Sequence, residues 1–373
     1  MKVLSLFDGM ACGMIAMKKA GVDVESYDAY EIDKYAVKTA QHNFPMIKEH
    51  GDVFSADFKQ YDGVDFMVGG SPCTYWSIAQ TKNRETVASG MGWELFSQYV
   101  RALNEAKPKY FIYENNKSMS KEIRTSIDKA FGFEAVCINS ALVSAQNRQR
   151  LYWVGKRNDD GTYSKVDVKK PEDRGILLRD ILETGIAWQE KSYNLTTRCN
   201  GAILSDTLKR HTHTMVAESV CVAAAVEYNP LHSCDVVVTD QNIRCTYKDG
   251  SGTAQGYTVT FDDVKSPSVI AGHAHKMKVI ERVTDKKQIP VYEVRGGRIT
   301  IKGKTYPIKL ADGFYIIRKL TVTECKRLQT VPDTYAFPVS DTQAYKMLGN
   351  GWTCEIIAHL IRSTLNDSGE FNG

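Results

Sequence analysis

The stretch VLSLFDGMACG, residues 3–13, predicts the first strand and helix in the fold of this 373-residue chain. Its first half, Val3–Phe7, is a short apolar run that indicates a buried strand, and a helical pattern follows over Gly13–Ala20. The glycines between them let the backbone approach a ligand, and the N–H groups of a helix N-terminus favour binding there. The spacing differs from G-x-G-x-x-G, which argues against a nicotinamide dinucleotide and therefore against an oxidoreductase.

The same alternation of apolar runs and helical patterns continues over about the first 155 residues. It predicts parallel strands with helices between them, the strands being Val24–Tyr30, Val64–Val68, Tyr110–Tyr113 and Leu151–Val154 and the helices Lys34–His42 and Glu94–Glu105. Short β runs separated by Gly, Asn and Asp then follow, and helical spacing returns at Thr323–Leu328 and Cys354–Leu365. We therefore expect an α/β fold with domains at 1–160 and 161–315, the latter smaller and mostly β, and a return segment at 316–373 that completes the first domain.

The composition excludes several classes of protein. No apolar stretch approaches the ~18 residues of a membrane span, and the N-terminus reads as a strand and not as a signal peptide. The nine cysteines are odd in number and form no C-x-x-C, which argues against a disulfide framework and a structural zinc site. His211 and His213, like His273 and His275, lack a nearby cysteine or carboxylate pattern, so we expect no metal. We expect a protein that is not secreted.

The positive charge is unevenly distributed. Lys191–Lys319 contains 19 Lys and Arg against 12 Asp and Glu, although the whole chain carries a net charge of only +4. A locally basic segment attracts a phosphate backbone, but a solvated basic face would have the same composition. The charge alone leaves both interpretations open.

Acidic residues follow two successive strands of the predicted sheet. Glu31 stands at the end of the second strand, where a carboxylate can accept both hydroxyls of a ribose. Asp52, in Gly51-Asp52-Val53-Phe54, comes after the next strand signal and can reach an adenine amino group. Ribose and adenine contacts without a phosphate-cradling loop favour S-adenosylmethionine over ATP or NAD.

Cys73 is the candidate nucleophile among the nine cysteines. It ends the run Gly69-Gly70-Ser71-Pro72-Cys73 directly after a strand, at the sheet edge where open α/β folds bind ligands. Pro72 restricts the backbone just before it, and the glycines leave room for a flat base. The thiolate is the reactive form of cysteine, and a nearby positive group favours it. Arg148 and Arg150 are suited to this, since residues two apart on a short strand Ala145–Arg150 share a face.

The chain resembles the cytosine-C5 DNA methyltransferase family over nearly its whole length. Its opening run and its G-G-S-P-C-T block are most similar to the branch that contains the animal de novo DNA methyltransferases. The motifs stand in the family's order: Phe7–Gly13, Glu31, Asp52, Ser71-Pro72-Cys73, Glu114-Asn115, Gln146-x-Arg148-x-Arg150, Arg327-Leu328-Gln329 and Leu348-Gly349-Asn350. The resemblance implies a Rossmann-like, S-adenosylmethionine-dependent fold, a mixed sheet with helices on both faces, and a separate target-recognition domain.

The resemblance also implies residue roles. Cys73 attacks C6 of a cytosine flipped out of duplex DNA, Glu114 supplies a proton at N3, and Arg148 and Arg150 hold the base carbonyl and the cysteine region. C5 then accepts the methyl group, and S-adenosylhomocysteine is released. The implied cofactor residues are Phe7, Asp8, Gly9, Gly13, Glu31, Asp52, Ser71, Pro72 and Asn350. The implied DNA contacts are Ser77, Lys82 and Arg84 in the loop Thr74–Trp93, and Thr196, Thr197 and Arg198.

Two positions depart from the family's pattern. Asn116 stands where valine usually follows Glu-Asn, which predicts altered packing below the flipped base. Trp352 follows Gly349-Asn350-Gly351, which predicts a reshaped methionine end of the cofactor pocket.

Other functions remain open. RNA cytosine-C5 methylation on the same scaffold is one alternative, and a catalytically silent DNA-binding homologue is another. We expect a monomer in the cytoplasm of a bacterial or phage-infected cell, or in the nucleus of a eukaryotic one. The DNA sequence that is read cannot be derived from these residues.

Overall fold

The computed structural model describes residues 1–78, 84–219, 290–367 and 369, and the backbone of three short strands between residues 234 and 255. The chain divides into two compact units. The large unit comprises Met1–Glu183, Glu190–Ala202 and Leu320–Gly373, and the small unit comprises Thr184–Gln189 and Ile203–Lys319. The small unit thus begins at Thr184 and not at the expected residue 161, since the strand Tyr163–Lys165 still pairs with the central sheet.

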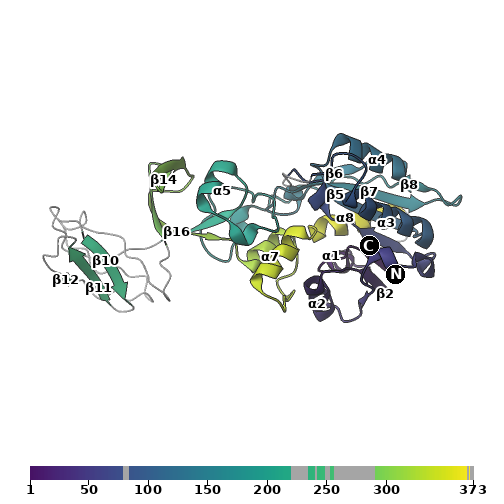
Figure 1. Ribbon diagram of the computed structural model, residues 1–373, viewed down its shortest axis with the longest axis horizontal. Helices are drawn as coiled ribbons and strands as arrows, with labels where there is room; N and C mark the ends of the chain where they lie inside the picture. The colour runs from purple at the N-terminus through teal and green to yellow at the C-terminus, as the bar shows by residue number, and fades with distance from the viewer. Residues whose placement is uncertain are drawn as a thin grey trace. The chain divides into compact units, whose positions relative to one another are not determined.

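The large unit is built on a mixed sheet, which confirms the predicted fold class (Figure 1). Its strands lie in the order β3-β2-β1-β4-β5-β7-β6, and β8 pairs with β7. Pairing is parallel from β3 to β5 and antiparallel around β7. The strands are β1 (Lys2–Leu6), β2 (Ser26–Tyr30), β3 (Lys48–Glu49), β4 (Phe66–Gly69), β5 (Tyr110–Asn116), β6 (Val136–Asn139), β7 (Gln149–Arg157) and β8 (Tyr163–Lys165). The carboxyl ends of the parallel strands therefore meet at one edge.

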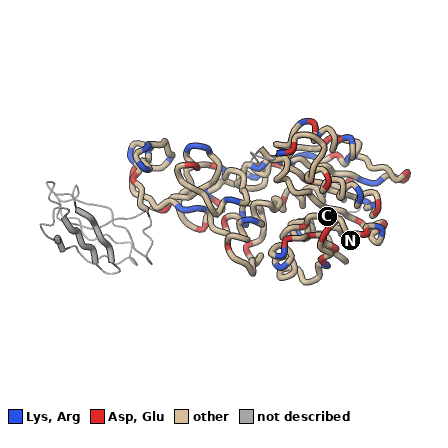
Figure 2. The backbone as a smooth tube through the Cα atoms, viewed as in Figure 1, with Lys and Arg blue, Asp and Glu red and all other residues tan. Residues whose placement is uncertain are grey.

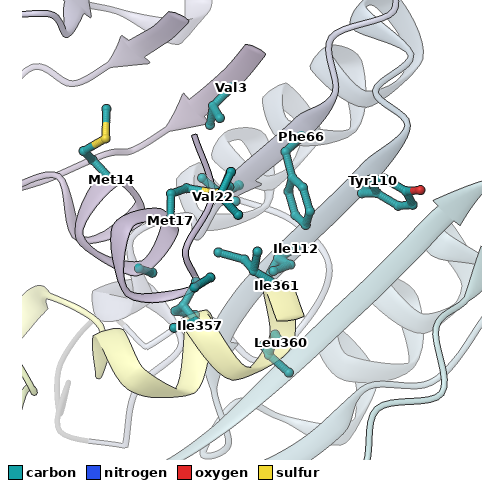
Figure 3. Close-up of a cluster of buried hydrophobic side chains, with 14 of the residues drawn as sticks. Val3, Met14, Met17, Val22, Phe66, Tyr110, Ile112, Ile357, Leu360 and Ile361 are labelled. Carbon is teal, nitrogen blue, oxygen red and sulfur yellow. The ribbon is translucent and has the colours of Figure 1, made fainter. Parts of the chain in front are cut away.

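Helices cover both faces of this sheet because successive residues of each strand point to opposite sides. Ile112 of β5 packs with α1 and α8 on one face, whereas Phe111 and Tyr113 pack with α3 and α4 on the other. Figure 3 shows Ile357, Leu360 and Ile361 of α8 beside the first helix. The helices of this unit are α1 (Cys12–Lys19), α2 (Lys34–Asn43), α3 (Met91–Ala106), α4 (Lys121–Phe131), α6 (Val322–Leu328), α7 (Asp341–Asn350) and α8 (Cys354–Asp367).

Short 3-10 helices lie between these elements. They are η1 (Val53–Ser55), η2 (Phe58–Tyr61), η3 (Cys73–Tyr75), η4 (Ser140–Leu142), η5 (Leu178–Ile181) and η6 (Cys199–Gly201).

The small unit is mostly β, as predicted. An antiparallel sheet has the order β15-β14-β13-β16-β9, and a second has the order β10-β11-β12. The helix α5 (Leu204–Arg210) also belongs to the described part of this unit. The strands are β9 (Met215–Ser219), β10 (Cys234–Thr239), β11 (Asn242–Tyr247), β12 (Thr253–Gln255), β13 (Val291–Arg295), β14 (Arg298–Ile301), β15 (Lys304–Pro307) and β16 (Gly313–Lys319). Arg298, Lys302 and Lys304 are exposed on the β14–β15 hairpin, and Figure 2 shows basic residues along this segment.

Two sequence predictions about the central strands are wrong. β5 continues to Asn116, so Glu114 lies inside the strand and not after it. The segment Ala145–Arg150 is not one strand, because its first part pairs with the loop at Ser192: the Ser192 N–H donates to the Ala145 carbonyl and the Asn147 N–H to the Ser192 carbonyl. β7 starts only at Gln149, which places Arg148 before the strand and Arg150 within it.

Candidate active site

The turn after β1 brings the backbone close to the end of β2. Phe7, Gly9 and Ala11 have φ angles of 58°, 61° and 59°, a left-handed conformation that is strained for the two residues with a side chain. The Gly9 N–H donates to Glu31 Oε2 at 2.8 Å. Gly13 lies inside α1, where an added Cβ would be 2.5 Å from the Tyr27 hydroxyl. Packing against Tyr27 thus accounts for this glycine without a ligand.

Asp8 is buried behind this turn with one oxygen unpaired. The hydroxyls of Ser5 and Tyr27 donate to Oδ1 at 2.5 and 2.6 Å, while Oδ2 has no partner among the described residues. Burial raises the pKa of Asp8 to about 6, against the lowering effect of the two hydroxyl bonds, and the charge of Glu31 raises it further. Ionising the buried Asp8 therefore costs free energy, and a positively charged group nearby would stabilise its carboxylate.

Two further carboxylates lie near Asp8. Glu31 accepts the N–H groups of Ile32 and Asp33 on Oε1, both at 2.8 Å, which fixes its side chain. Glu49, which the sequence analysis missed, has both carboxylate oxygens buried and unpaired within the described residues. Burial, Asp8 and Glu31 raise the pKa of Glu49 to about 8. A strand of two residues, as β3 is, leaves no periodic pattern in the sequence. The position of Glu49 beside β2 is therefore evident only from the strand pairing in the structure.

Asp52 is exposed and accepts the Phe54 N–H at 3.0 Å, as the N-cap of η1. The side chain of Ile32, next to Glu31, is 76% exposed. An apolar side chain exposed to that extent beside Glu31 could cover a flat ring, a feature that sequence reasoning also missed. The side chains of Asp52 and Ile32 are therefore both accessible, after the ends of β3 and β2.

The turn that carries Cys73 is hydrogen-bonded to side chains of β5. The Ser71 and Tyr113 hydroxyls are 2.6 Å apart, and the Asn115 amide donates to the Ser71 carbonyl at 3.1 Å. The Asn116 amide donates to the Cys73 carbonyl at 3.2 Å. Cys73 itself starts η3 and is partly exposed. The backbone of this candidate nucleophile is thus held by side chains of the strand that carries Glu114.

Glu114 is held through both of its carboxylate oxygens. Arg150 Nε lies 2.9 Å from Oε1, and each of the two side chains is 11% exposed. The Trp352 indole N–H donates to Oε2 at 2.9 Å. Gly70 lies against the same group, since an added Cβ there would be 3.1 Å from Oε2 and 2.7 Å from the Glu114 carbonyl. The geometry thus joins Glu114, Arg150 and the turn before Cys73.

Arg148 contacts other parts of the protein. Its guanidinium donates to Asn194 Oδ1 at 2.9 Å, to the Leu195 carbonyl at 3.1 Å and to the Gly351 carbonyl at 2.8 Å, with longer bonds to Gly349. Burial and the neighbouring Arg150 lower the pKa of Arg148 to about 10. Arg148 therefore ties the 194–195 loop to the segment after α7, and of the two arginines it is Arg150 that bonds Glu114.

The predicted DNA contacts are spread over two segments of the large unit. Arg84 donates to the carbonyls of Trp76 and Ser118, at 3.3 and 2.7 Å, which anchors this end of the loop. Ser77 donates its N–H to the Cys73 carbonyl at 3.0 Å. Lys82 lies outside the described residues.

The second segment follows Arg148's partner loop. Thr197 and Arg198 are exposed, and Thr196 is partly buried. The backbone of Thr196 approaches Gly349 so closely that an added Cβ on the glycine would lie 2.4 Å away.

The segment at the end of α7 is held in place by the side chain of Gln329. Gln329 Nε2 donates to the carbonyls of Leu348 and Gly351 at 2.7 and 3.0 Å. Asn350 is exposed at the end of α7. The described residues contain no cluster of three potential metal ligands, and no described helix is long and apolar enough to cross a membrane.

The chain is similar to known proteins over nearly its whole length. The family model described as C-5 cytosine-specific DNA methylase matches residues 1–366. The orphan methyltransferase M.SPRI of Bacillus phage SPR is 25% identical, with 98% of each chain covered. The type II methyltransferase M1.ScrFI of Lactococcus lactis subsp. cremoris is 26% identical, with 94% of this chain and 74% of that protein covered.

Solved structures share the fold. The Entamoeba histolytica methyltransferase EhMeth has a TM-score of 0.57 at 11% identity, with 98% of each chain covered. A mutant of Spodoptera frugiperda DNMT2 has a TM-score of 0.52 at 15% identity, with 97% of this chain and 98% of that chain covered. At these identities the likeness bears on the fold alone.

Proposed function

The chain belongs to the C-5 cytosine-specific DNA methylase family, and on that premise we propose that Cys73 is the nucleophile that attacks a cytosine flipped out of duplex DNA. The observation that carries this proposal is the link between Cys73 and β5. Asn116 of that strand bonds the Cys73 carbonyl, and Glu114, two residues earlier, is paired with Arg150. Nucleophile, acid and cation therefore meet at one edge of the sheet.

Membership of a methyltransferase family implies S-adenosylmethionine as cofactor, which supplies a methyl group bonded to a positively charged sulfur. The acidic residues at the ends of β1 to β3 fit that ligand. Asp8 Oδ2 and both Glu49 oxygens are buried without partners among the described residues, and a cation would stabilise them. We propose that Glu31 binds the ribose and Asp52 the adenine, with Phe7, Gly9, Ser71, Pro72 and Asn350 completing the site.

The proposed chemistry assigns one task to each side chain. The Cys73 thiolate forms a bond to C6, the C5=C6 electron pair moves into the C4–C5 bond, and the C4=N3 pair moves to N3. N3 takes up the proton of Glu114 with that pair and returns it to Glu114 when the ring is restored. Arg150 offers N–H groups to the base carbonyl while its Nε holds Glu114. C5 becomes the carbon that accepts the methyl group, after which loss of the C5 proton and of Cys73 restores the ring. Arg148 positions the segments around this site and does not touch the base.

We propose that the small unit, expected at 161–315, is the target-recognition domain. Its exposed Arg298, Lys302 and Lys304 suit a phosphate backbone. Thr197 and Arg198 of the large unit are exposed, and we propose that they contact DNA beside the flipped base. We also propose that the protein is a monomer. By analogy with the phage and bacterial sources of its relatives, we propose that it acts in the cytoplasm of a bacterial or phage-infected cell.

The test is tritium transfer from labelled S-adenosylmethionine to unmethylated genomic DNA, with a tRNA mixture in parallel. We expect label in the DNA and none with Cys73→Ser. DNA containing 5-fluorocytosine should trap a covalent adduct with the wild type, because the C5 position cannot then lose a proton. Label in tRNA alone would favour the RNA alternative. An adduct formed by Cys73→Ser would contradict the choice of nucleophile, and bisulfite mapping would give the DNA sequence that is read.

A further inference from the structure

Trp352 contacts the catalytic acid from the far end of the chain. Its indole N–H donates to Glu114 Oε2 at 2.9 Å, although 238 residues separate the two. From the sequence we expected this residue to affect the methionine end of the cofactor pocket. In the structure its indole N–H bonds the Glu114 carboxylate, and the same carboxylate lies close to Gly70 in the turn before Cys73.

The indole is carried by a firmly held piece of backbone. The Gly351 carbonyl, next to Trp352, accepts from Arg148 at 2.8 Å and from Gln329 at 3.0 Å. The ring itself packs against the hydrophobic core under α1 and α8. A donor fixed in this way can determine the orientation of the group that it bonds, because neither partner is free to move.

We propose that Trp352 is a positioning residue for Glu114, a role that rests on the function proposed above. N3 and the exocyclic amino group of cytosine lie in one plane, and a carboxyl group serves both only when its own plane matches. The last torsion of a glutamate side chain is soft, with a broad range of angles. Arg150 on Oε1 and Trp352 on Oε2 fix that torsion from opposite sides.

The indole also stabilises the charge that develops during attack. When Cys73 adds to C6, the proton of Glu114 passes to N3 and leaves a carboxylate. An N–H aimed in advance at that oxygen stabilises the product of proton transfer more than the neutral acid. Loss of the N–H should therefore slow the chemical step and leave the binding of cofactor and DNA nearly unchanged.

The experiment compares Trp352→Phe, which keeps an aromatic ring but loses the N–H, with the wild type. The matched control is Trp153→Phe, because the buried Trp153 indole donates its N–H to Asp128 Oδ1, at 2.8 Å, and not to a residue of the proposed site. Methyl transfer to unmethylated genomic DNA gives kcat and KM, and calorimetry gives the cofactor Kd. Release of tritium from DNA labelled at cytosine C5, without cofactor, reports the attack and proton transfer alone.

For Trp352→Phe we expect kcat to fall about 10- to 100-fold, with KM and cofactor Kd within about threefold of wild type. Tritium release should fall in parallel. Trp153→Phe should lower the melting temperature and change kcat less than about threefold. If Trp352→Phe does not fold, 3-benzothienylalanine at position 352, with sulfur in place of N–H, should give the same loss of kcat.

Two results would overturn the proposal. One is a kcat of the position-352 variants within about twofold of wild type, and the other is a loss explained entirely by weaker cofactor binding. Absence of any methyl transfer by the wild type would instead overturn the proposed function, and this inference with it.

Discussion

Replacing Arg148 by methionine removes a buried guanidinium but keeps a side chain of similar length. The guanidinium has three short hydrogen bonds, to Asn194 Oδ1, the Leu195 carbonyl and the Gly351 carbonyl, at 2.9, 3.1 and 2.8 Å. Its bonds to the Gly349 carbonyl, at 3.3 and 3.4 Å, are longer and weaker. The variant would leave these acceptors without their donor, in a segment that adjoins the proposed cofactor site.

Two contributions to the free energy of unfolding change in opposite directions in Arg148→Met. Three hydrogen bonds from a charged donor stabilise the fold by about 1.5–3 kcal/mol each. The variant is relieved of the cost of burying the guanidinium, which amounts to several kcal/mol. The Gly351 carbonyl also keeps its bond from Gln329 at 3.0 Å. We therefore expect a net loss of about 2–4 kcal/mol in the free energy of unfolding.

Urea unfolding measures this loss, and calorimetry with S-adenosylmethionine measures binding. For Arg148→Met we expect cofactor affinity to fall at least tenfold, because Asn350 lies between two carbonyls that Arg148 holds. At saturating cofactor, kcat should stay within about threefold of wild type. Arg150→Met is the matched control: Arg150 bonds Glu114 at 2.9 Å, so kcat should fall while cofactor affinity is kept.

The opposite pattern would refute this reasoning. If Arg148→Met kept wild-type stability and cofactor affinity but lost turnover, Arg148 would act on the base and not on the protein.

Three further predictions follow from single contacts. Asn116→Val removes the bond to the Cys73 carbonyl, at 3.2 Å, and should lower kcat about 3- to 30-fold with little change in melting temperature; an unchanged kcat would show that the turn needs no such support. Burial raises the pKa of Asp8 from 3.8 to about 6, so its contribution to stability is complete below pH 4 and is lost as pH rises through 6. At pH 7.5 the cofactor-free Asp8→Asn variant should therefore resist urea better than wild type, by up to about 3 kcal/mol, and at pH 4 the two should be equal. Gly13→Ala places a Cβ 2.5 Å from the Tyr27 hydroxyl and should lower the melting temperature, whereas Gly13→Ala with Tyr27→Phe should recover part of that loss.

The sequence predicts best those strands and helices that have a strong local pattern. The predicted strand Val3–Phe7 corresponds to β1, and the predicted helix Cys354–Leu365 corresponds to α8. The helix Lys121–Phe131 was missed, although Ser120 caps it and Gly132 ends it. β5 was cut short at Tyr113 because Glu114, Asn115 and Asn116 are polar, yet all three are buried and remain in the ladder with β7. Arg150 of the neighbouring strand bonds Glu114, and the turn Ser71–Cys73 accepts hydrogen bonds from Asn115 and Asn116, so the three buried side chains have partners that no local pattern reports.

The sequence by itself determined the family, the α/β class and the position of Cys73 after a strand, because these features depend on motifs and periodicities within short windows. Only the tertiary structure decided which groups the two arginines, Asn116 and Trp352 contact. Arg148 meets Gly351 across 203 residues and Trp352 meets Glu114 across 238. Such contacts depend on strand order and on the return of α8 beside α1, which bring distant residues together without leaving a pattern in either segment.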